Sequence, residues 1–258
     1  HNAYAVAVSA DGEYIVTGSS DDSVYLFDKD SSTPLWSYET GYGIHYVAIS
    51  ADGEYIVAGS GDDKVYLFDK DSSTPLWSYT TGGSIKSVDI SADGEYIAAG
   101  SYDNKVYLFD KDSSIPLWNY AAGNSVGSVS ISADGKYIVA GSDDSKLFFF
   151  SKDSGTPLWS YEDFEGKPYV TISAEGDYIF AGTNTVYLFN RESSSPIWSY
   201  GESLWHSSVS ISADGKYMVA GLHEDDIYVF MQDTVSRPSA IPYGPRSDSL
   251  TLNDTTLG

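Results

Sequence analysis

Short apolar runs separated by turn-forming residues follow one another along most of the chain. In one representative stretch the runs cover residues 46–50, 55–60, 64–69 and 75–79, and each is rich in β-branched and aromatic residues. Each run has the length of a β-strand, and none shows the periodicity of an amphipathic helix. The pattern therefore predicts an all-β fold built from short strands.

The same pattern recurs about every 41 residues, which makes the chain an internal repeat. The repeat is marked by a Ser-Ala-Asp-Gly block, or Ser-Ala-Glu-Gly in one copy, beginning at Ser9, Ser50, Ser91, Ser132, Ser173 and Ser212. A second block carries one tryptophan per unit at Trp36, Trp77, Trp118, Trp159 and Trp198. Four strands in about 40 residues, repeated six times, predict a β-propeller of four-stranded blades.

The turns and the tryptophan have defined places in such a blade. Residues 51–54 suit a tight hairpin between the first two strands, with Gly53 at a positive φ that a Cβ atom would oppose. The tryptophan of the fourth strand is expected to cover the gap between adjacent blades. A solenoid of stacked sheets is the alternative arrangement, and a ring is favoured because closure removes two exposed edges.

Two propeller families resemble this repeat. Residues 65–69, followed by Leu76 and Trp77, resemble the repeat of quinoprotein (PQQ-like) propellers, in which a tryptophan docks blades together. Residues 50–55 and the following Ala-Gly-Ser resemble WD40 repeats, although Phe-Asp replaces the usual Trp-Asp pair in three units. Hybrid repeats of this kind are similar to those of secreted or surface-anchored archaeal and bacterial proteins. The resemblance implies the fold and says little about activity.

The number of blades depends on how the last unit is completed. Six units within residues 1–233 supply the first three strands, but only five supply the tryptophan-bearing fourth. Residues 234–258 form a tail rich in Pro, Ser and Asp that reads as a linker, yet residues 248–253 alternate like an edge strand. We expect a six-bladed ring whose last blade the tail can complete. Seven blades with further sequence is the alternative.

The charge of the chain limits its partners. Fourteen Lys and Arg residues against 37 Asp and Glu give a formal net charge of −23. Nucleic acids and anionic membranes need a basic footprint, so neither is expected as a partner. No apolar run reaches the length of a membrane-spanning helix, and the absence of cysteine excludes disulfides and thiolate metal sites. Together with the resemblance, an acidic surface suited to saline surroundings predicts a secreted or cell-surface protein.

One face of the propeller varies between units. In a propeller the fourth-to-first and second-to-third connections share one face, and in this chain the fourth-to-first connections differ while the turns of the opposite face recur almost unchanged. A constant scaffold with one diversified rim favours recognition of a protein or glycan there. The residues expected to bind such a partner are Tyr42, His45, Tyr46, Lys86, Tyr102, Phe164, Tyr169, Trp205, His206 and His223. Drift in tolerant loops, and Trp205 as a plug at the ring closure, remain alternatives.

Paired acids recur on the opposite face, as in Asp28 with Asp30 and Asp69 with Asp71. An Asp-x-Asp pair is compatible with Ca²⁺, but the fuller pattern of a calcium loop is missing. Hydrogen bonding from the carboxylates to the backbone of the turn is the favoured interpretation, and no cofactor is expected.

Motifs for catalysis are scarce. The histidines occupy unrelated repeat positions, and neither a nucleophile elbow nor a phosphate-binding glycine loop occurs. A quinone cofactor, which the resemblance to dehydrogenases would imply, needs polar ligands that have no match here. We therefore expect a non-catalytic recognition or assembly module. The alternatives are a hydrolase or lyase using His45, His206 or His223, and a structural domain of a surface layer or filament that self-associates through the tail.

Overall fold

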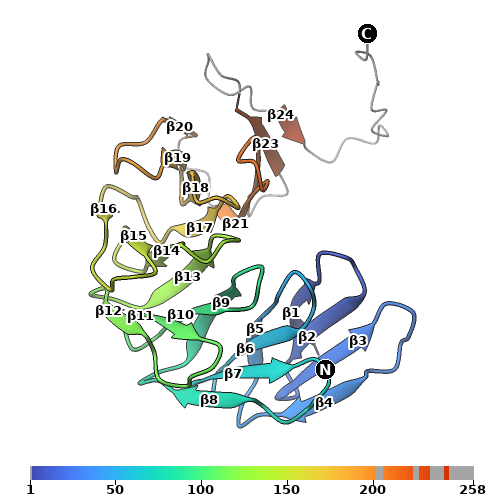
Figure 1. Ribbon diagram of the computed structural model, residues 1–258. Coiled ribbons are helices and arrows are strands. Elements are labelled where there is room, and N and C mark those ends of the chain that lie inside the picture. The colour runs from blue at the N-terminus through green and yellow to red at the C-terminus, as the bar shows by residue number, and fades with distance from the viewer. Residues whose placement is uncertain (1, 202–205, 223–226, 233–240, 244–258) are drawn as a thin grey trace.

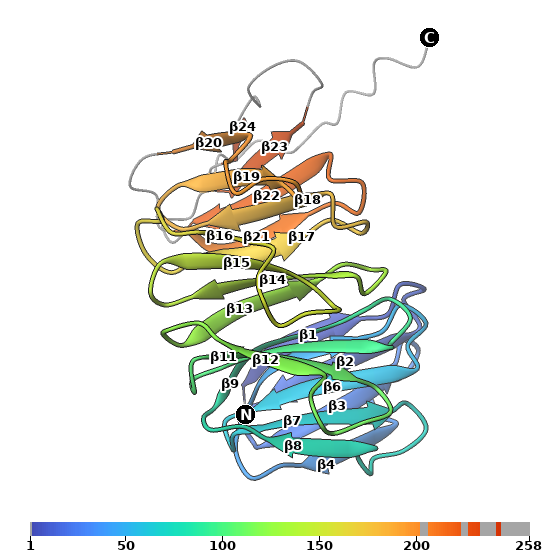
Figure 2. The same cartoon turned by 60° about the vertical axis from the view of Figure 1, so that its left-hand side comes forward.

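The computed structural model describes residues 2–201, 206–222, 227–232 and 241–243, and this part of the chain is all β. Its strands form six antiparallel sheets of four strands each, in sequence order within each sheet. We call these sheets blades 1 to 6; Figure 1 and Figure 2 show them fanned out one after another. The predicted propeller with six four-stranded blades is confirmed. No helix long and apolar enough to cross a membrane occurs within these residues.

Each blade comprises four consecutive strands, from the innermost to the outermost. Blades 1 and 2 contain β1 (Ala3–Val8), β2 (Tyr14–Ser19), β3 (Ser23–Asp28), β4 (Trp36–Glu39), β5 (Ile44–Ile49), β6 (Tyr55–Ser60), β7 (Lys64–Asp69) and β8 (Trp77–Thr80). Blades 3 and 4 contain β9 (Ile85–Ile90), β10 (Tyr96–Ser101), β11 (Lys105–Asp110), β12 (Trp118–Ala121), β13 (Val126–Ile131), β14 (Tyr137–Ser142), β15 (Lys146–Ser151) and β16 (Trp159–Tyr161). Blades 5 and 6 contain β17 (Tyr169–Ile172), β18 (Tyr178–Gly182), β19 (Val186–Asn190), β20 (Trp198–Tyr200), β21 (His206–Ile211), β22 (Tyr217–Leu222), β23 (Ile227–Met231) and β24 (Ile241–Tyr243).

The tail completes the last blade, but not with the predicted segment. The fourth strand of blade 6 is β24, in which Ile241 pairs with Val229 of β23. Residues 248–253, predicted as an edge strand, lie outside the described part of the chain.

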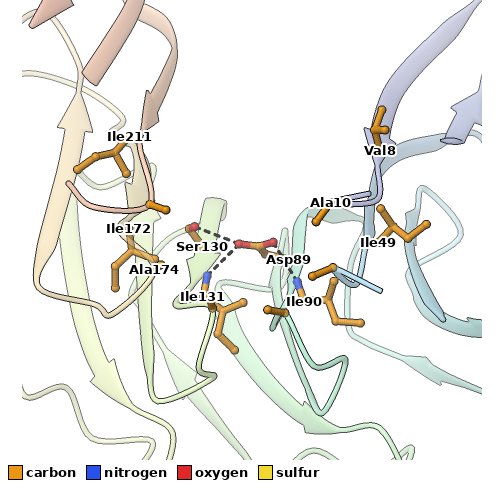
Figure 3. A pocket seen from close by; sticks show the side chains of 14 residues that line it. Val8, Ala10, Ile49, Asp89, Ile90, Ser130, Ile131, Ile172, Ala174 and Ile211 are labelled. Atoms are coloured by element: carbon orange, nitrogen blue, oxygen red, sulfur yellow. Dashed lines mark hydrogen bonds between the residues drawn. The ribbon is translucent and has the colours of Figure 1, made fainter. Parts of the chain in front are cut away.

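The first strands of the blades line a central channel of about 390 Å³. Its wall consists of alanines from the Ser-Ala-Asp-Gly turns, of the isoleucine or valine that ends each first strand, and of Asp89 and Ser130, as Figure 3 shows. Successive blades are joined here by one backbone hydrogen bond each, in which an alanine amide donates to the alanine carbonyl of the next blade over 2.9 to 3.0 Å. The series starts with Ala10 donating to Ala51 and ends with Ala174 donating to Ala213.

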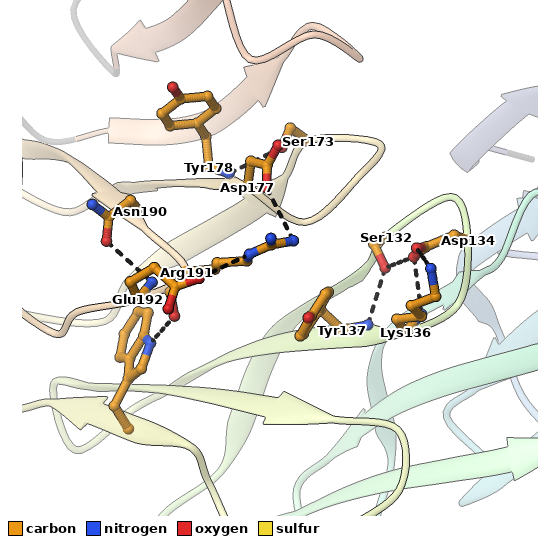
Figure 4. A network of polar contacts seen from close by, with 11 residues as sticks. Ser132, Asp134, Lys136, Tyr137, Ser173, Asp177, Tyr178, Asn190, Arg191 and Glu192 are labelled. Atoms are coloured by element: carbon orange, nitrogen blue, oxygen red, sulfur yellow. Dashed lines mark hydrogen bonds and ion pairs between the residues drawn. The ribbon is translucent and has the colours of Figure 1, made fainter.

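The recurring Ser-Ala-Asp-Gly turn holds itself together. In blade 2 the Ser50 hydroxyl donates to Asp52 over 2.6 Å and accepts from the Tyr55 amide over 3.0 Å. Gly53 has the predicted positive φ, 75°. Tyr14 of the preceding blade lies so close that a Cβ atom on Gly53 would be 2.6 Å from its ring. A glycine is therefore required both by the backbone conformation of the turn and by the close packing of Tyr14 from the preceding blade. Figure 4 shows the same Ser-Asp-Tyr arrangement at Ser132.

The tryptophans dock adjacent blades, as predicted. The Trp77 indole Nε1 donates to the Lys111 carbonyl of the next blade over 2.7 Å, and its ring lies 5.3 Å from that of Phe109. Equivalent indole-to-carbonyl bonds are made by Trp36, Trp118 and Trp159. Each of the five blade interfaces also contains its own cluster of buried apolar side chains.

The arc of blades is open where the ring was expected to close. The first strands pack pairwise from β1 to β21, but no such packing joins β21 back to β1 within the described residues. Val6 of β1 is 66% exposed, whereas its counterpart Val129 in blade 4 is 6% exposed. Figure 1 shows blades 1 and 6 on either side of the opening.

Candidate functional site

Hydrogen bonds confirm that the variable connections share one face. We call it the variable face: it comprises the fourth-to-first connections between blades and the second-to-third turns within them. The Gly41 amide, in a connection between blades, donates to Asp62 in a second-to-third turn over 3.0 Å. The Gly82 amide donates to Asp103 over 2.9 Å in the same way. The two kinds of loop therefore support each other.

A buried tyrosine anchors each of these aspartates. The Tyr66 hydroxyl donates to Asp62 over 2.6 Å, and Tyr107 donates to Asp103. Both tyrosines are almost completely buried. Burial, followed by the hydrogen bond to the carboxylate, raises the pKa of both phenols well above the ordinary value of 10.0. The loops are thus held by a rigid polar frame.

This frame predicts a loss of stability at alkaline pH. Above about pH 10 a tyrosine in the unfolded chain releases its proton while Tyr66 and Tyr107 keep theirs, so the folded state binds more protons. Their contribution is therefore complete below pH 10 and is lost as the pH rises further. Urea unfolding from about pH 8 to about pH 11 should show this fall. The fall in the free energy of unfolding should be smaller in a Tyr66→Phe/Tyr107→Phe variant than in wild type, and Tyr42→Phe should behave like wild type. An equal fall in wild type and both variants would contradict this prediction.

Blade 4 lacks the anchoring hydroxyl. Phe148 stands where the other blades have tyrosine, and Asp144 holds the place of Asp62 and Asp103, so the bond from a phenol hydroxyl to Oδ2 of this aspartate is missing. We expect Phe148→Tyr to raise the free energy of unfolding by about 1 kcal/mol, because the hydroxyl gains a charged acceptor. Phe150→Tyr is the matched control: it places a hydroxyl in the apolar core and should destabilise the protein. Thermal unfolding distinguishes the two, and a lower melting temperature for Phe148→Tyr would refute the prediction.

Aromatic and cationic residues meet on the variable face, near the start of the first strands. Tyr4 and His45 occupy the same repeat position in blades 1 and 2, and their rings stack at 5.2 Å. Lys86 holds this position in blade 3, and its Nζ lies 4.0 Å from the centre of the Tyr102 ring. Burial, and secondarily the charge of Lys86, lowers the pKa of His45. We call Tyr4, His45, Lys86 and Tyr102 the mouth cluster.

Several tyrosines at the mouth are open to solvent. Tyr42 is 61% exposed and Tyr102 is 51% exposed, and Tyr46 is also exposed. Lys86 forms no ion pair within the described part of the chain. In a protein with a net charge of −23, a lysine that forms no ion pair within the described residues is a local exception to the acidic surface.

Farther round the face, Lys167 and Tyr169 lie together. The Lys167 Nζ is 5.7 Å from the Tyr169 ring and 3.4 Å from Asp143. Its tip occupies the space beside Gly127, where a Cβ atom would be 2.2 Å away. Gly127 holds the position that Lys86 has in the preceding blade. The missing side chain therefore leaves room for a lysine from the next loop.

Phe164 does not belong to the exposed surface, contrary to the sequence prediction. It is 6% exposed and packs edge-to-face on Tyr161 and Tyr187, with ring centres 4.9 and 5.0 Å away. It is a member of the apolar cluster between blades 4 and 5. The longer connection here folds its phenylalanine inward because burying the ring is more favourable than exposing it. Trp205 and His223 lie outside the described residues, and for His206 only the backbone, at the start of β21, is described. A catalytic role for His45, His206 or His223 therefore stays a prediction.

The acids of the opposite face shape their turns. Oδ1 of Asp28 accepts the Asp30 amide over 2.8 Å, and Asp69 and Asp110 accept in the same way. Lys29 bridges Glu13 and Asp30, at 2.9 Å to each. This confirms the turn-shaping interpretation. In the described ranges, no group of three or more acids or histidines is placed to hold a metal ion.

Asp89 in the channel was missed by the sequence analysis. Its carboxylate accepts from the amides of Ile90 and Ile131 and from the Ser130 hydroxyl, at 2.9 to 3.0 Å. The bonds from Ser130 and Ile131 join blade 3 to blade 4 (Figure 3), and burial raises the pKa of Asp89. Comparing the units would have found it, since alanine, serine or threonine holds this position in the others.

Comparison with known families agrees with this geometry. A family model described as outer membrane protein assembly factor BamB matches residues 20–234, most of the chain. The chain belongs to this BamB-like family of PQQ-type repeats. A second model, the WD domain G-beta repeat, matches residues 1–28, so both predicted resemblances are confirmed. No curated protein matches the chain. BamB-like propellers are commonly scaffolds or binding modules, and the family identifies no specific partner here.

Proposed function

We propose that this BamB-like propeller is a non-catalytic recognition module, secreted or displayed at a cell surface. Its variable face binds a protein or glycan partner at the channel mouth. The observation that carries the proposal is the mouth cluster: the exposed ring of Tyr102 lies 4.0 Å from Lys86, which forms no ion pair within the described residues. Tyrosine side chains offer large, rigid contact areas with a polar tip, as binding surfaces require.

The charge of the cluster indicates what the partner presents. The molecule is strongly acidic, and its cations on the opposite face, such as Lys70 and Lys111, are engaged by neighbouring acids. Lys86 offers positive charge to an incoming group, whereas the lowered pKa of the nearby His45 favours its neutral form. A carboxylate of a protein or of an acidic glycan fits this environment, because such a pair is strengthened when water is excluded. Nucleic acid and direct membrane insertion are not proposed, in view of the net charge.

The rigidity of the frame supports binding rather than turnover. Asp62, Tyr66 and Gly41 fix the loops by short hydrogen bonds, so little conformational entropy is lost when a partner docks. A hydrolase or lyase needs a general acid or base with a tuned pKa beside the substrate. Of the three histidines considered, His45 alone has a described side chain, and it is stacked on Tyr4.

The test compares three forms of the protein as bait in native surface extracts: wild type, a Tyr42→Ala/Lys86→Ala/Tyr102→Ala variant, and an Asp112→Ala/Lys136→Ala variant of the opposite face. Captured partners are identified, purified and titrated by calorimetry. The proposal predicts that wild type and the opposite-face variant bind with equal affinity and that the variable-face variant binds at least ten-fold more weakly, a difference of about 1.4 kcal/mol. Equal binding by all three forms would refute it, as would turnover of a captured glycan.

A further inference from the structure

Blade 1 carries an apolar face that nothing in the described chain covers. Val6 and Val8 of β1 are 66% and 53% exposed. Their counterparts in blade 4, Val129 and Ile131, are each 6% exposed because blade 3 covers them. In the interior blades, the side chains at these positions are therefore buried against the preceding blade, whereas in blade 1 they are exposed.

Blade 6 has the complementary open face. Val219 and Val229 are 38% and 36% exposed, and Ile227 is 44% exposed. The counterparts of the two valines in blade 2, Val57 and Leu67, are fully buried against blade 3. The open side of blade 6 is thus the side that, in every interior blade, is covered by the following blade.

The two faces also lack one tyrosine-glycine contact of the repeat. At all five interfaces, the tyrosine that starts a second strand lies over the turn glycine of the next blade, as Tyr178 does over Gly215. Tyr217 of blade 6 is instead 47% exposed, and nothing lies within 4 Å of the Cβ position of Gly12 in blade 1. The chain of alanine hydrogen bonds likewise stops, since within the described residues none leads from the Ala213 amide or to the Ala10 carbonyl.

We propose that the open faces of blades 1 and 6 together form a docking site for one further four-stranded blade of this same repeat. Its turn glycine would lie against Tyr217, its tyrosine against Gly12, and its alanine would accept from Ala213 and donate to Ala10. The five interfaces already in the molecule are the template for both contacts. A second copy of the chain is not the proposed occupant. It would bring its matching face only together with five more blades, and blade 1 of the first copy already lies beside the opening (Figure 1).

The absence of cysteine in the chain allows a direct test. Single cysteines are introduced as Val6→Cys and Val219→Cys, with Leu117→Cys just before the outer strand β12, 51% exposed, as the control. Thiol labelling is measured in dilute protein, before and after a copy of residues 82–122 is attached ahead of residue 1. We expect fast labelling at all three sites in the original chain. In the lengthened chain we expect a fall of roughly ten-fold or more at positions 6 and 219, and no change at position 117.

Each other outcome overturns the proposal. Protection of position 6 alone means that the added blade docks on one face only. Slow labelling of both positions in the original chain means direct contact between blades 6 and 1, or, where protection grows with protein concentration, a second copy. Fast labelling of both in the lengthened chain means that no docking occurs. If the lengthened chain does not fold, the same unit attached after residue 258 gives the same decision.

Discussion

Replacing Trp118 by alanine is expected to lower the free energy of unfolding by about 3 to 5 kcal/mol. The indole donates to the Lys152 carbonyl over 2.8 Å, and its ring packs on Phe150 of the next blade at 5.2 Å. Its loss removes a hydrogen bond across the interface and leaves a cavity between blades 3 and 4. Denaturant titration followed by circular dichroism measures the change.

Two further substitutions identify the source of this effect. Trp118→Phe keeps most of the ring packing but removes the indole N–H, and should cost about 1 kcal/mol, in the range of one hydrogen bond. Leu117→Ala removes an apolar side chain that is 51% exposed and should be close to neutral. If Trp118→Ala and Leu117→Ala cost the same, the tryptophan does not dock the blades.

Gly135→Ala should destabilise the protein by about 1 to 3 kcal/mol more than Gly12→Ala. Both glycines have a positive φ, 70° and 74°, so an alanine costs about 1 to 2 kcal/mol of backbone strain at either site. At Gly135 the new Cβ atom would also lie 2.6 Å from the ring of Tyr96 in the preceding blade, whereas at Gly12 it would meet nothing. The difference therefore isolates packing between blades.

The same pair of variants reports on the open interface. Equal losses for Gly12→Ala and Gly135→Ala would show that Gly12 is covered in solution, which contradicts the open arc. A second glycine of the set, Gly94, should behave like Gly135 because its Cβ atom would be 2.4 Å from Tyr55. Urea titrations of the three variants under one condition are sufficient.

The blades could be predicted because each unit repeats the same local rules. Strand length, the Ser-Ala-Asp-Gly turn and the docking tryptophan depend on contacts within one unit or with its neighbour, and both are written in every copy. Two strands of the second unit, at residues 55–60 and 64–69, have the predicted bounds. The open end could not be predicted, since it depends on the curvature summed over all interfaces.

The sequence predicts which residues lie on the variable face, but not which of them are in contact. Topology places Tyr42, Tyr46 and Lys86 on one face, and the structure adds which of them meet. The contact between Lys86 and Tyr102 joins a strand to a turn 16 residues later, and its geometry depends on side-chain rotamers. Phe164 was predicted to be exposed because it lies in a loop between blades. Its burial depends on contacts with the rings of Tyr161 and Tyr187, which the sequence does not reveal. Asp89 was missed because its partners lie in the next blade.

The two faces of the propeller use their polar side chains differently. On the opposite face the recurring acids are used within their own turns, as at Asp28 and Asp69. On the variable face the frame of Asp62 and Tyr66 is equally rigid, yet it carries exposed tyrosines and the unpaired charge of Lys86. A fixed support with an unsatisfied surface is the arrangement that recognition requires.

Hydrogen exchange of the protein with and without its captured partner tests this central claim most directly. The account predicts that binding slows exchange in residues 40–46, 81–86 and 102–104 of the variable face, and leaves the opposite turns at residues 10–13, 51–54 and 92–95 unchanged. Slowed exchange confined to the opposite turns or to the outer strands, with the variable face unaffected, would contradict it.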